Sequence, residues 1–144
     1  MKARMVAIAS DHAGVEMKEM LKAELGTLGY EAIDLGTQGG ASVDYPDYAH
    51  ALAEWVEKHE GSKGVLICGS GIGMSIAANR HKGIRAALVH NGEEAALARG
   101  HNDANVLCLG ARLIGSDAAK DVLKIFLATE FEGGRHEKRV EKLG

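Results

Sequence analysis

Residues 64 to 75 read Gly-Val-Leu-Ile-Cys-Gly-Ser-Gly-Ile-Gly-Met-Ser, an apolar run that leads directly into a thiol, a hydroxyl and three alternating glycines. Its apolar half, Val65 to Ile67, is typical of a buried parallel strand, and the residues from Ser75 onward favour a helix. The glycine-rich turn between them would direct the free N–H groups and the positive dipole end of that helix towards the turn. The turn therefore has two interpretations: a tight connection with a buried, inert Cys68, or a site that binds anions and carries a reactive thiol.

Similar apolar runs recur along the chain and alternate with helical patterns. The sequence predicts strands at residues 5–9, 32–35, 65–68, 86–89 and 106–109, and helices at about 14–28, 46–59, 74–80, 93–100 and 117–130. This alternation favours parallel βαβ crossovers. We therefore expect an α/β fold, a Rossmann-like three-layer sandwich around a five-stranded parallel sheet. The 144 residues contain no linker or repeat, so residues 1–144 are expected to form a single domain.

Composition excludes several classes of protein. The net charge of −3 gives no basic surface for nucleic acid, and no apolar run approaches the roughly 18 residues that cross a membrane. The two cysteines, Cys68 and Cys108, both end apolar runs with no signal peptide before them. This usage is typical of a reducing compartment, so we expect a cytoplasmic protein without a disulfide.

Two kinds of cofactor are not expected. The glycines at 69, 71 and 73 follow the third strand as G-x-G-x-G, which does not match the dinucleotide-binding pattern, and no P-loop motif occurs. The seven histidines include no His-x-x-x-His spacing, and the cysteines form no Cys-x-x-Cys. We expect neither a nucleotide cofactor nor a metal.

Ligands of open parallel sheets bind beyond the carboxyl ends of the strands. In this sequence polar groups follow each predicted strand there, in the segments 10–14, 44–46, 68–70, 90–91 and 110–112. Asp11 and His12 have two interpretations, because they could cap the following helix or face a polar ligand.

Two further polar segments are not expected at the carboxyl ends of the strands. His101-Asn102-Asp103 precedes the fifth strand, so it is either a helix C-cap with a turn or part of a site completed by a neighbouring chain. Residues 135–143 predict a short helix with Arg135 and Arg139 on one face and only Val140 and Leu143 to bury. This helix is either a solvated tail or an element docked on a partner subunit.

Several motifs together resemble the type B ribose-5-phosphate isomerases over nearly the whole chain. The same superfamily includes isomerases of allose 6-phosphate and galactose 6-phosphate. The matching segments are Ser10-Asp11-His12-Ala13-Gly14, Asp44-Tyr45-Pro46, residues 67–73 with Ala77-Ala78-Asn79, His101-Asn102-Asp103-Ala104-Asn105, Gly110-Ala111-Arg112, and Glu132-Gly133-Gly134-Arg135-His136. One branch of the family uses a glutamate as base. Here Met74 stands at that position and Cys68 is present, so the chain resembles the cysteine branch.

The resemblance implies interconversion of ribose 5-phosphate and ribulose 5-phosphate through a cis-enediol or enediolate. Cys68 is the expected base, because a helix N-terminus lowers the pKa of a thiol below its usual value of about 8.5. Ser70 and the amides of the turn, at Gly69, Gly71, Ile72 and Gly73, are expected to stabilise the oxyanion.

The remaining roles follow from the resemblance. It implies that His101 opens the sugar ring with Asp11 nearby, and that Arg135 and Arg139 hold the phosphate. The hydroxyls and phosphate would be ordered by four further side chains, Arg112, His12, Asn102 and Tyr45.

The resemblance also implies a homodimer with active sites shared between subunits, which would explain the positions of His101 and the final helix. The sequence leaves open whether dimers pair into tetramers. It also leaves two alternatives for function, an isomerase of a six-carbon sugar phosphate and a sugar-phosphate-binding module without catalysis. Pure binding would not require a thiol.

Overall fold

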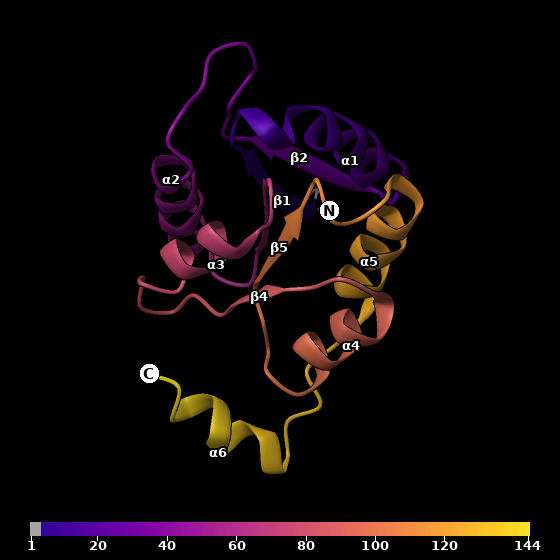
Figure 1. Ribbon diagram of the computed structural model, residues 1–144. Coiled ribbons are helices and arrows are strands. Elements are labelled where there is room, and N and C mark those ends of the chain that lie inside the picture. The colour runs from indigo at the N-terminus through magenta and orange to yellow at the C-terminus, as the bar shows by residue number, and fades with distance from the viewer. Residues whose placement is uncertain (1–3) are drawn as a thin grey trace.

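The computed structural model describes residues 4–144 and contains one five-stranded parallel sheet with helices on both faces (Figure 1). The strand order is β2-β1-β3-β5-β4, and every neighbouring pair is parallel. The strands are β1 Arg4–Ser10, β2 Tyr30–Asp34, β3 Lys63–Cys68, β4 Ala86–Leu88 and β5 Val106–Gly110. The expected three-layer α/β architecture and its five strands are confirmed.

Two apolar clusters lie on the two faces of the sheet. One cluster joins the sheet to α1 Val15–Thr27, α4 Gly92–Gly100 and α5 Ser116–Ala128, and the other joins it to α2 Tyr45–Lys58 and α3 Ile72–Ala78. Successive residues of β3 divide between the clusters, with Val65 and Ile67 on one face and Leu66 and Cys68 on the other. Burial on both faces explains why these strands are continuous apolar runs.

The helix after the glycine-rich turn begins earlier than expected. The sequence favours a helix over 74–80, but α3 starts at Ile72 and ends at Ala78. Gly71 precedes it with φ of 80°, a left-handed conformation that glycine adopts without strain. The chain therefore turns at Gly71 and places Gly73 and Met74 inside the helix. Before α1, a short 3₁₀ turn covers His12–Gly14.

A buried ion pair lies between α1 and the end of β2. The Lys18 side chain is fully buried and donates to both carboxylate oxygens of Asp34, at 2.8 and 2.7 Å, and Lys22 donates to Asp34 Oδ2 at 2.9 Å. Burial alone would raise the pKa of the Asp34 carboxyl, but the hydrogen bonds from Lys18, Lys22 and the Gly36 amide outweigh it. The pKa of Asp34 is therefore held well below its usual range.

The last helix, α6 Arg135–Glu141, lies apart from the sheet and the two helix layers that cover it (Figure 1). None of its residues is buried in the described chain. It extends beyond the amino ends of the strands, whereas the loop into α2 and the start of α3 lie at the carboxyl ends. No helix among residues 4–144 is long and apolar enough to span a membrane.

Candidate active site

The carboxyl ends of β1, β3 and β5 meet at one cavity of about 530 Å³. The strands are held in register here, since Ser10 pairs with Ile67 and Cys68 pairs with Gly110. The residues lining the cavity are Asp11, Tyr45, Cys68, Gly69, Ser70, Ile72, Gly73, Ile76, Arg112 and Leu113. The structure thus brings together most of the side chains that the sequence predicts beyond the strand ends. Ile76 and Leu113 were not predicted.

Cys68 is the last residue of β3, and its side chain borders the cavity. It is 5% exposed, and its Sγ accepts a hydrogen bond from the Gly71 amide at 3.1 Å. Cys108, in contrast, lies within β5 with two strand residues after it and is fully buried. Burial, together with the neighbouring Cys68, raises the pKa of the Cys108 thiol. The two cysteines therefore differ in access to a ligand, although both follow apolar runs.

Ser70 lines the cavity and also forms a hydrogen bond within the turn. Its Oγ accepts a hydrogen bond from the Ile72 amide at 3.2 Å. With the Gly71 amide directed at Cys68, two of the predicted backbone donors are already used inside the turn. The hydroxyl hydrogen of Ser70 can still be donated to a ligand oxygen.

Tyr45 and Arg112 approach the turn closely because glycines leave room for them. A Cβ atom on Gly73 would overlap the Tyr45 ring, and one on Gly69 would lie 3.2 Å from Nη1 of Arg112. The backbone also ties these elements together, since the Arg112 amide donates to the Gly69 carbonyl at 3.0 Å. The glycines at 69 and 73 therefore place a phenol and a guanidinium beside Cys68.

Asp11 caps the turn that follows β1, which is one of its two interpretations, and it also borders the cavity. Its Oδ1 accepts a hydrogen bond from the Ala13 amide at 3.0 Å and caps the 3₁₀ turn, and the same side chain lines the cavity. His12 is exposed and accepts a hydrogen bond from the Val43 amide at its Nδ1, at 3.1 Å. His12 does not line the cavity within this chain.

His101 caps the C-terminus of α4 and lies against α6. Its ring stacks on His136, with centroids 4.1 Å apart and an interplanar angle of 15°, and its Nε2 is 3.7 Å from the Glu132 carboxylate. Removal from water lowers the pKa of His136, and repulsion from His101, Arg135 and Arg139 lowers it further. Glu132 and His136 belong to the last of the matching segments, residues 132–136, but no pattern in the sequence pairs them with His101.

His101 and Cys68 lie at opposite ends of the sheet. Cys68 pairs with Gly110, the last residue of β5, whereas His101 precedes Val106, the first residue of β5. The length of β5 alone is about 13 Å at 3.3 Å per residue. One chain therefore does not bring the thiol and the His101 imidazole to the same small ligand.

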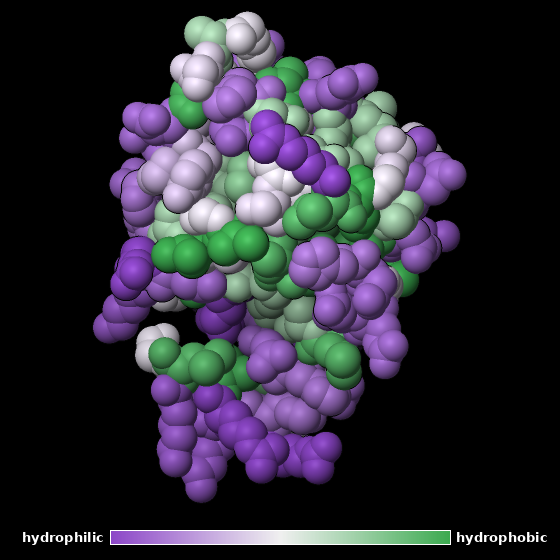
Figure 2. All heavy atoms as spheres, viewed as in Figure 1, coloured by the Kyte–Doolittle hydropathy of each residue, from purple (hydrophilic) through white to green (hydrophobic). Residues whose placement is uncertain are grey.

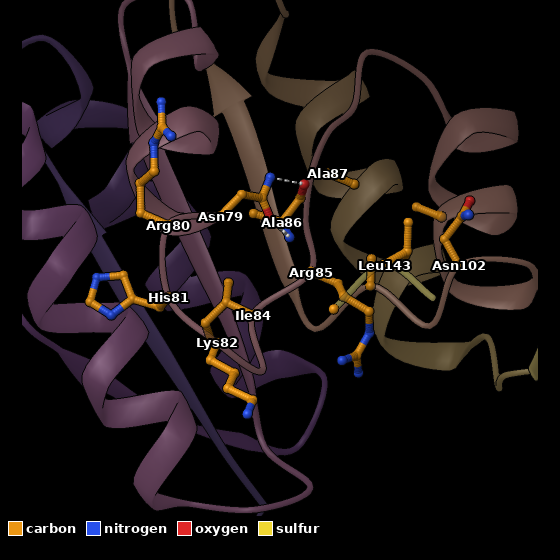
Figure 3. Close-up of a pocket in the computed structure, with 13 residues that line it drawn as sticks. Asn79, Arg80, His81, Lys82, Ile84, Arg85, Ala86, Ala87, Asn102 and Leu143 are labelled. Carbon is orange, nitrogen blue, oxygen red and sulfur yellow. Dashed lines mark hydrogen bonds between the residues drawn. The ribbon is translucent and has the colours of Figure 1, made fainter. Parts of the chain in front are cut away.

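Asn102 faces a second cavity, a groove of about 560 Å³ between the α3–β4 loop and the end of the chain (Figure 3). The loop is held by Asn79, whose side chain exchanges two hydrogen bonds with the Ala86 backbone, at 2.8 and 2.9 Å. The groove floor is apolar, with Ile84, Ala86, Ala87, Ala98 and Ala104, and Leu143 closes one side. Asn102, Arg135 and Arg139 are thus separated from the Cys68 cavity within one chain, as His101 is.

An apolar surface surrounds the mouth of the Cys68 cavity. Ile72 and Ile76 of α3 are 51% and 53% exposed, and Leu113 is 61% exposed. Figure 2 shows hydrophobic atoms in a band over α3, and further hydrophobic atoms on α6 across the hollow below it. Side chains of this kind are typical of a surface that contacts another protein.

Comparison with known proteins gives consistent matches over almost the full length. A sequence model of the ribose/galactose isomerase family matches residues 6–143. A putative sugar phosphate isomerase of Bacillus subtilis is 52% identical, covering 96% of this chain and 93% of the relative. The structure of ribose 5-phosphate isomerase B from Anaplasma phagocytophilum is 55% identical with a TM-score of 0.93, covering 100% of this chain and 99% of that one. The Mycoplasma genitalium enzyme with bound ribulose-5-phosphate is 41% identical with a TM-score of 0.95, covering 99% of this chain and 95% of that one.

Proposed function

The chain belongs to the ribose/galactose isomerase family, and we propose that it interconverts ribose 5-phosphate and ribulose 5-phosphate as a type B ribose-5-phosphate isomerase. The observation that carries this function is the Cys68 thiol at the cavity where three parallel strands end. An aldose–ketose isomerase needs one base that removes a proton beside the carbonyl and returns it to the adjacent carbon. Cys68 is the group in this cavity that suits the transfer.

The thiolate and the turn have different tasks in the mechanism: the thiolate transfers the proton, and the turn stabilises negative charge. Cys68 takes the proton from C2 of the open-chain aldose and gives it to C1 of the enediolate, so one base serves both carbons. The Ser70 hydroxyl and the free amides of the turn stabilise the oxyanion that forms between these steps. In enzymes where one such donor has been removed, the loss is about 3–4 kcal/mol. Tyr45, Asp11 and Arg112 line the same cavity, which supports their proposed role of binding the sugar hydroxyls.

The active site is shared between two copies of this chain. His101 is the ring-opening acid–base, and it lies at the amino end of the sheet with α6, whereas the thiol lies at the carboxyl end. A two-fold dimer brings the amino end of one subunit to the carboxyl end of the other. It covers the exposed apolar side chains of α3 and gives α6 the partner it lacks.

The groove beside Asn102 indicates how the subunits fit. Its apolar floor suits the Ile72 and Ile76 side chains of the other copy, and insertion of that α3 carries its Cys68 towards His101. Arg135 and Arg139 then bind the phosphate of the sugar in the partner's cavity as charge-assisted donors.

The test is turnover by protein that has been treated with a chelator. We expect conversion of ribose 5-phosphate to ribulose 5-phosphate without added metal, and slower conversion of allose 6-phosphate and galactose 6-phosphate. Faster conversion of a six-carbon substrate would assign the chain to that activity. Saturable binding of ribose 5-phosphate without turnover would show a binding module instead.

The proposed setting is carbohydrate metabolism in the cytoplasm, in the pentose phosphate pathway. Both cysteines are free and buried, as expected where thiols stay reduced. A base that must exist as a thiolate also depends on a reducing compartment.

A further inference from the structure

The segment before α6 and the first turn of that helix place two further groups against His101. We propose that Glu132 and His136 are positioning residues for ring opening: the His136 ring holds the His101 imidazole in one orientation, and the Glu132 carboxylate stabilises the charge that this imidazole gains with a proton. This role rests on the proposed function, because it requires His101 to act on the sugar. It does not require either group to touch the substrate.

The His136 ring covers one face of the His101 imidazole. The two ring centroids are 4.1 Å apart, and the ring planes are inclined by 15°. His101 is the C-cap residue of α4 and its side chain is 38% exposed, so the backbone alone leaves the ring free to rotate. The His136 side chain is only 12% exposed, because it packs on this neighbour. The stack therefore restricts the orientation of His101.

The Glu132 carboxylate lies beside both rings. Its Oε2 is 3.7 Å from Nε2 of His101, and its Oε1 is 3.8 Å from Nε2 of His136. These distances are too long for hydrogen bonds but short enough for a strong interaction between charges. A fixed negative charge lowers the energy of positive charge that appears beside it during a proton transfer. The interaction strengthens where the partner subunit displaces water from this end of the sheet.

Gly100 leaves the space that the Glu132 carboxylate occupies. A Cβ atom on Gly100 would lie 2.9 Å from Oε2 of Glu132. The Glu132 amide also donates to the Gly100 carbonyl at 3.0 Å, so the last residue of α4 fixes Glu132 next to His101. A side chain at position 100 would meet the end of a flexible side chain rather than backbone. It should therefore displace the carboxylate and leave the fold intact.

His136 suits the stack because it is uncharged near pH 7. Removal from water lowers its pKa, and repulsion from His101, Arg135 and Arg139 lowers it further. A neutral ring adds no positive charge against a proton on His101. Arg135 and Arg139, which are proposed to hold the phosphate, lie on the same short helix. The stack therefore connects phosphate binding with the orientation of the ring-opening imidazole.

The chemistry of ring opening explains why orientation matters. The C1 hydroxyl of the cyclic sugar loses a proton, the bond between C1 and the ring oxygen O4 breaks as the C1 carbonyl forms, and O4 gains a proton. His101 takes the first proton and gives it to O4, so the step needs no other reactant. One imidazole must reach two oxygens bonded to the same carbon, and a misplacement of about 1 Å can lower a rate about 100-fold.

A second stacked histidine in the chain provides a matched control. His59 caps α2 and stacks on Trp55 with centroids 4.1 Å apart and planes inclined by 16°, and its Nδ1 is 2.7 Å from the Trp55 carbonyl oxygen. It lines neither the Cys68 cavity nor the groove beside Asn102. His59→Ala removes the same kind of contact together with a hydrogen bond. It should cost at least as much stability as His136→Ala and leave the reaction unchanged.

The reaction is measured from both sugars, in variants whose folding is verified by circular dichroism. Ribose 5-phosphate starts as a closed ring, whereas exchange of the C1 proton of ribulose 5-phosphate with deuterated water starts from an open chain. We expect His136→Ala, Glu132→Gln and Gly100→Ala to lower kcat for ribose 5-phosphate about tenfold and the exchange rate by less than about twofold. His136→Phe keeps a neutral flat ring and should retain at least about a third of the parent kcat. His59→Ala should retain all of it.

Two results would overturn the positioning role. An equal loss of both rates would mean that these residues only hold α6 in place, since a displaced phosphate site would slow both reactions. Unchanged kcat in His136→Ala and Glu132→Gln would mean that His101 needs neither group. A His136→Phe protein as slow as His136→Ala would remove the stack from the mechanism.

NMR of the His101 ring tests the geometry without turnover. His136→Ala should remove the ring-current shift of the His101 ring protons, His136→Phe should keep such a shift, and His59→Ala should leave these signals unchanged. Identical His101 signals in His136→Ala and the parent would show that the rings do not stack, which overturns the inference. If the parent protein does not isomerise ribose 5-phosphate, the proposed function is rejected and the positioning role falls with it, while NMR still decides whether the stack holds His101.

Discussion

The two ends of the parallel sheet differ in what the chain places on them. The carboxyl end has a closed turn, in which Cys68 and Ser70 accept hydrogen bonds from amides two or three residues away. The amino end has His101 stacked on α6, a helix with no buried residue in the described chain. The carboxyl end is thus organised by hydrogen bonds within one short turn. At the amino end, α6 is left without a covering element in the described chain. Under the proposed mechanism the reaction uses both ends, and these come from different copies of the chain.

The largest expected effect is at the carboxyl end. Cys68→Ala should lower turnover of ribose 5-phosphate by at least about 10³-fold, within the range for loss of a general base. Cys68→Ser should be nearly as poor, because a hydroxyl is a far weaker base at neutral pH. The measurement is ketose formation, with sugar phosphate binding by calorimetry expected to persist.

Cys108→Ala is the control for that change, since it removes a thiol that does not border the cavity. It should keep turnover and lose only modest stability from the small cavity left behind. Turnover by Cys68→Ala within tenfold of the parent would remove the cysteine from the mechanism.

The next largest loss of turnover is expected at the amino end of the sheet. His101→Asn should lower turnover of the cyclic aldose by about 10²-fold or more, because it removes the ring-opening imidazole. It should affect much less the exchange of the C1 proton of ribulose 5-phosphate with deuterated water, which starts from an open-chain sugar. Proton exchange followed by NMR separates the two steps. An equal loss in both would place His101 in the proton transfer itself.

Mixing two inactive variants tests whether the two ends come from different chains. In a mixed dimer of Cys68→Ala and Arg139→Ala with shared sites, one site has both lesions and the other has none. Random pairing makes about half of the dimers mixed, so total activity should recover to about a quarter of the parent value. Native mass spectrometry verifies the mixed dimers. Mixed dimers as inactive as their parents would mean that both residues act within one chain.

The smallest effect on activity is expected at the ion pair of Asp34, which lies at the carboxyl end but outside the cavity. Asp34→Asn leaves the buried Lys18 with only the exposed Glu19 carboxylate, 3.5 Å away, and should cost about 3 kcal/mol of unfolding free energy near pH 7. Because the pKa of Asp34 is lowered in the folded protein, its contribution is present above the unfolded value of about 3.9 and is lost as the pH falls below it. Urea unfolding of both proteins should therefore show a constant difference from pH 5 to 8 and a smaller one below about pH 4. A difference that does not change with pH would mean that the charge of Asp34 is not its source.

Local patterns in the sequence were sufficient to predict which residues lie at the carboxyl end of the sheet. Apolar strands such as 65–68 are recognisable because both of their faces are buried, and parallel strands bring their ends to one edge. The position of Cys68 beside Ser70, Asp11, Tyr45 and Arg112 followed from that rule, and the cavity confirms it. The start of α3 was placed late, because helical periodicity does not reveal that Gly71 would adopt the left-handed turn.

Other features depended on contacts between segments far apart in the chain. Lys18 is a charged residue that the helical pattern does not mark as buried, yet it is fully buried because β2 brings Asp34 to it across 16 residues. His101, Glu132 and His136 converge because α6 returns to the end of α4, which no spacing in the sequence indicates. Local patterns in the sequence were enough to predict the sheet and the residues beyond the strand ends, because burial and strand direction are encoded locally. Only the tertiary structure decided that His101 meets Glu132 and His136 and that Lys18 is buried against Asp34, since these contacts depend on where the segment before α6, α6 itself and β2 pack rather than on a local pattern.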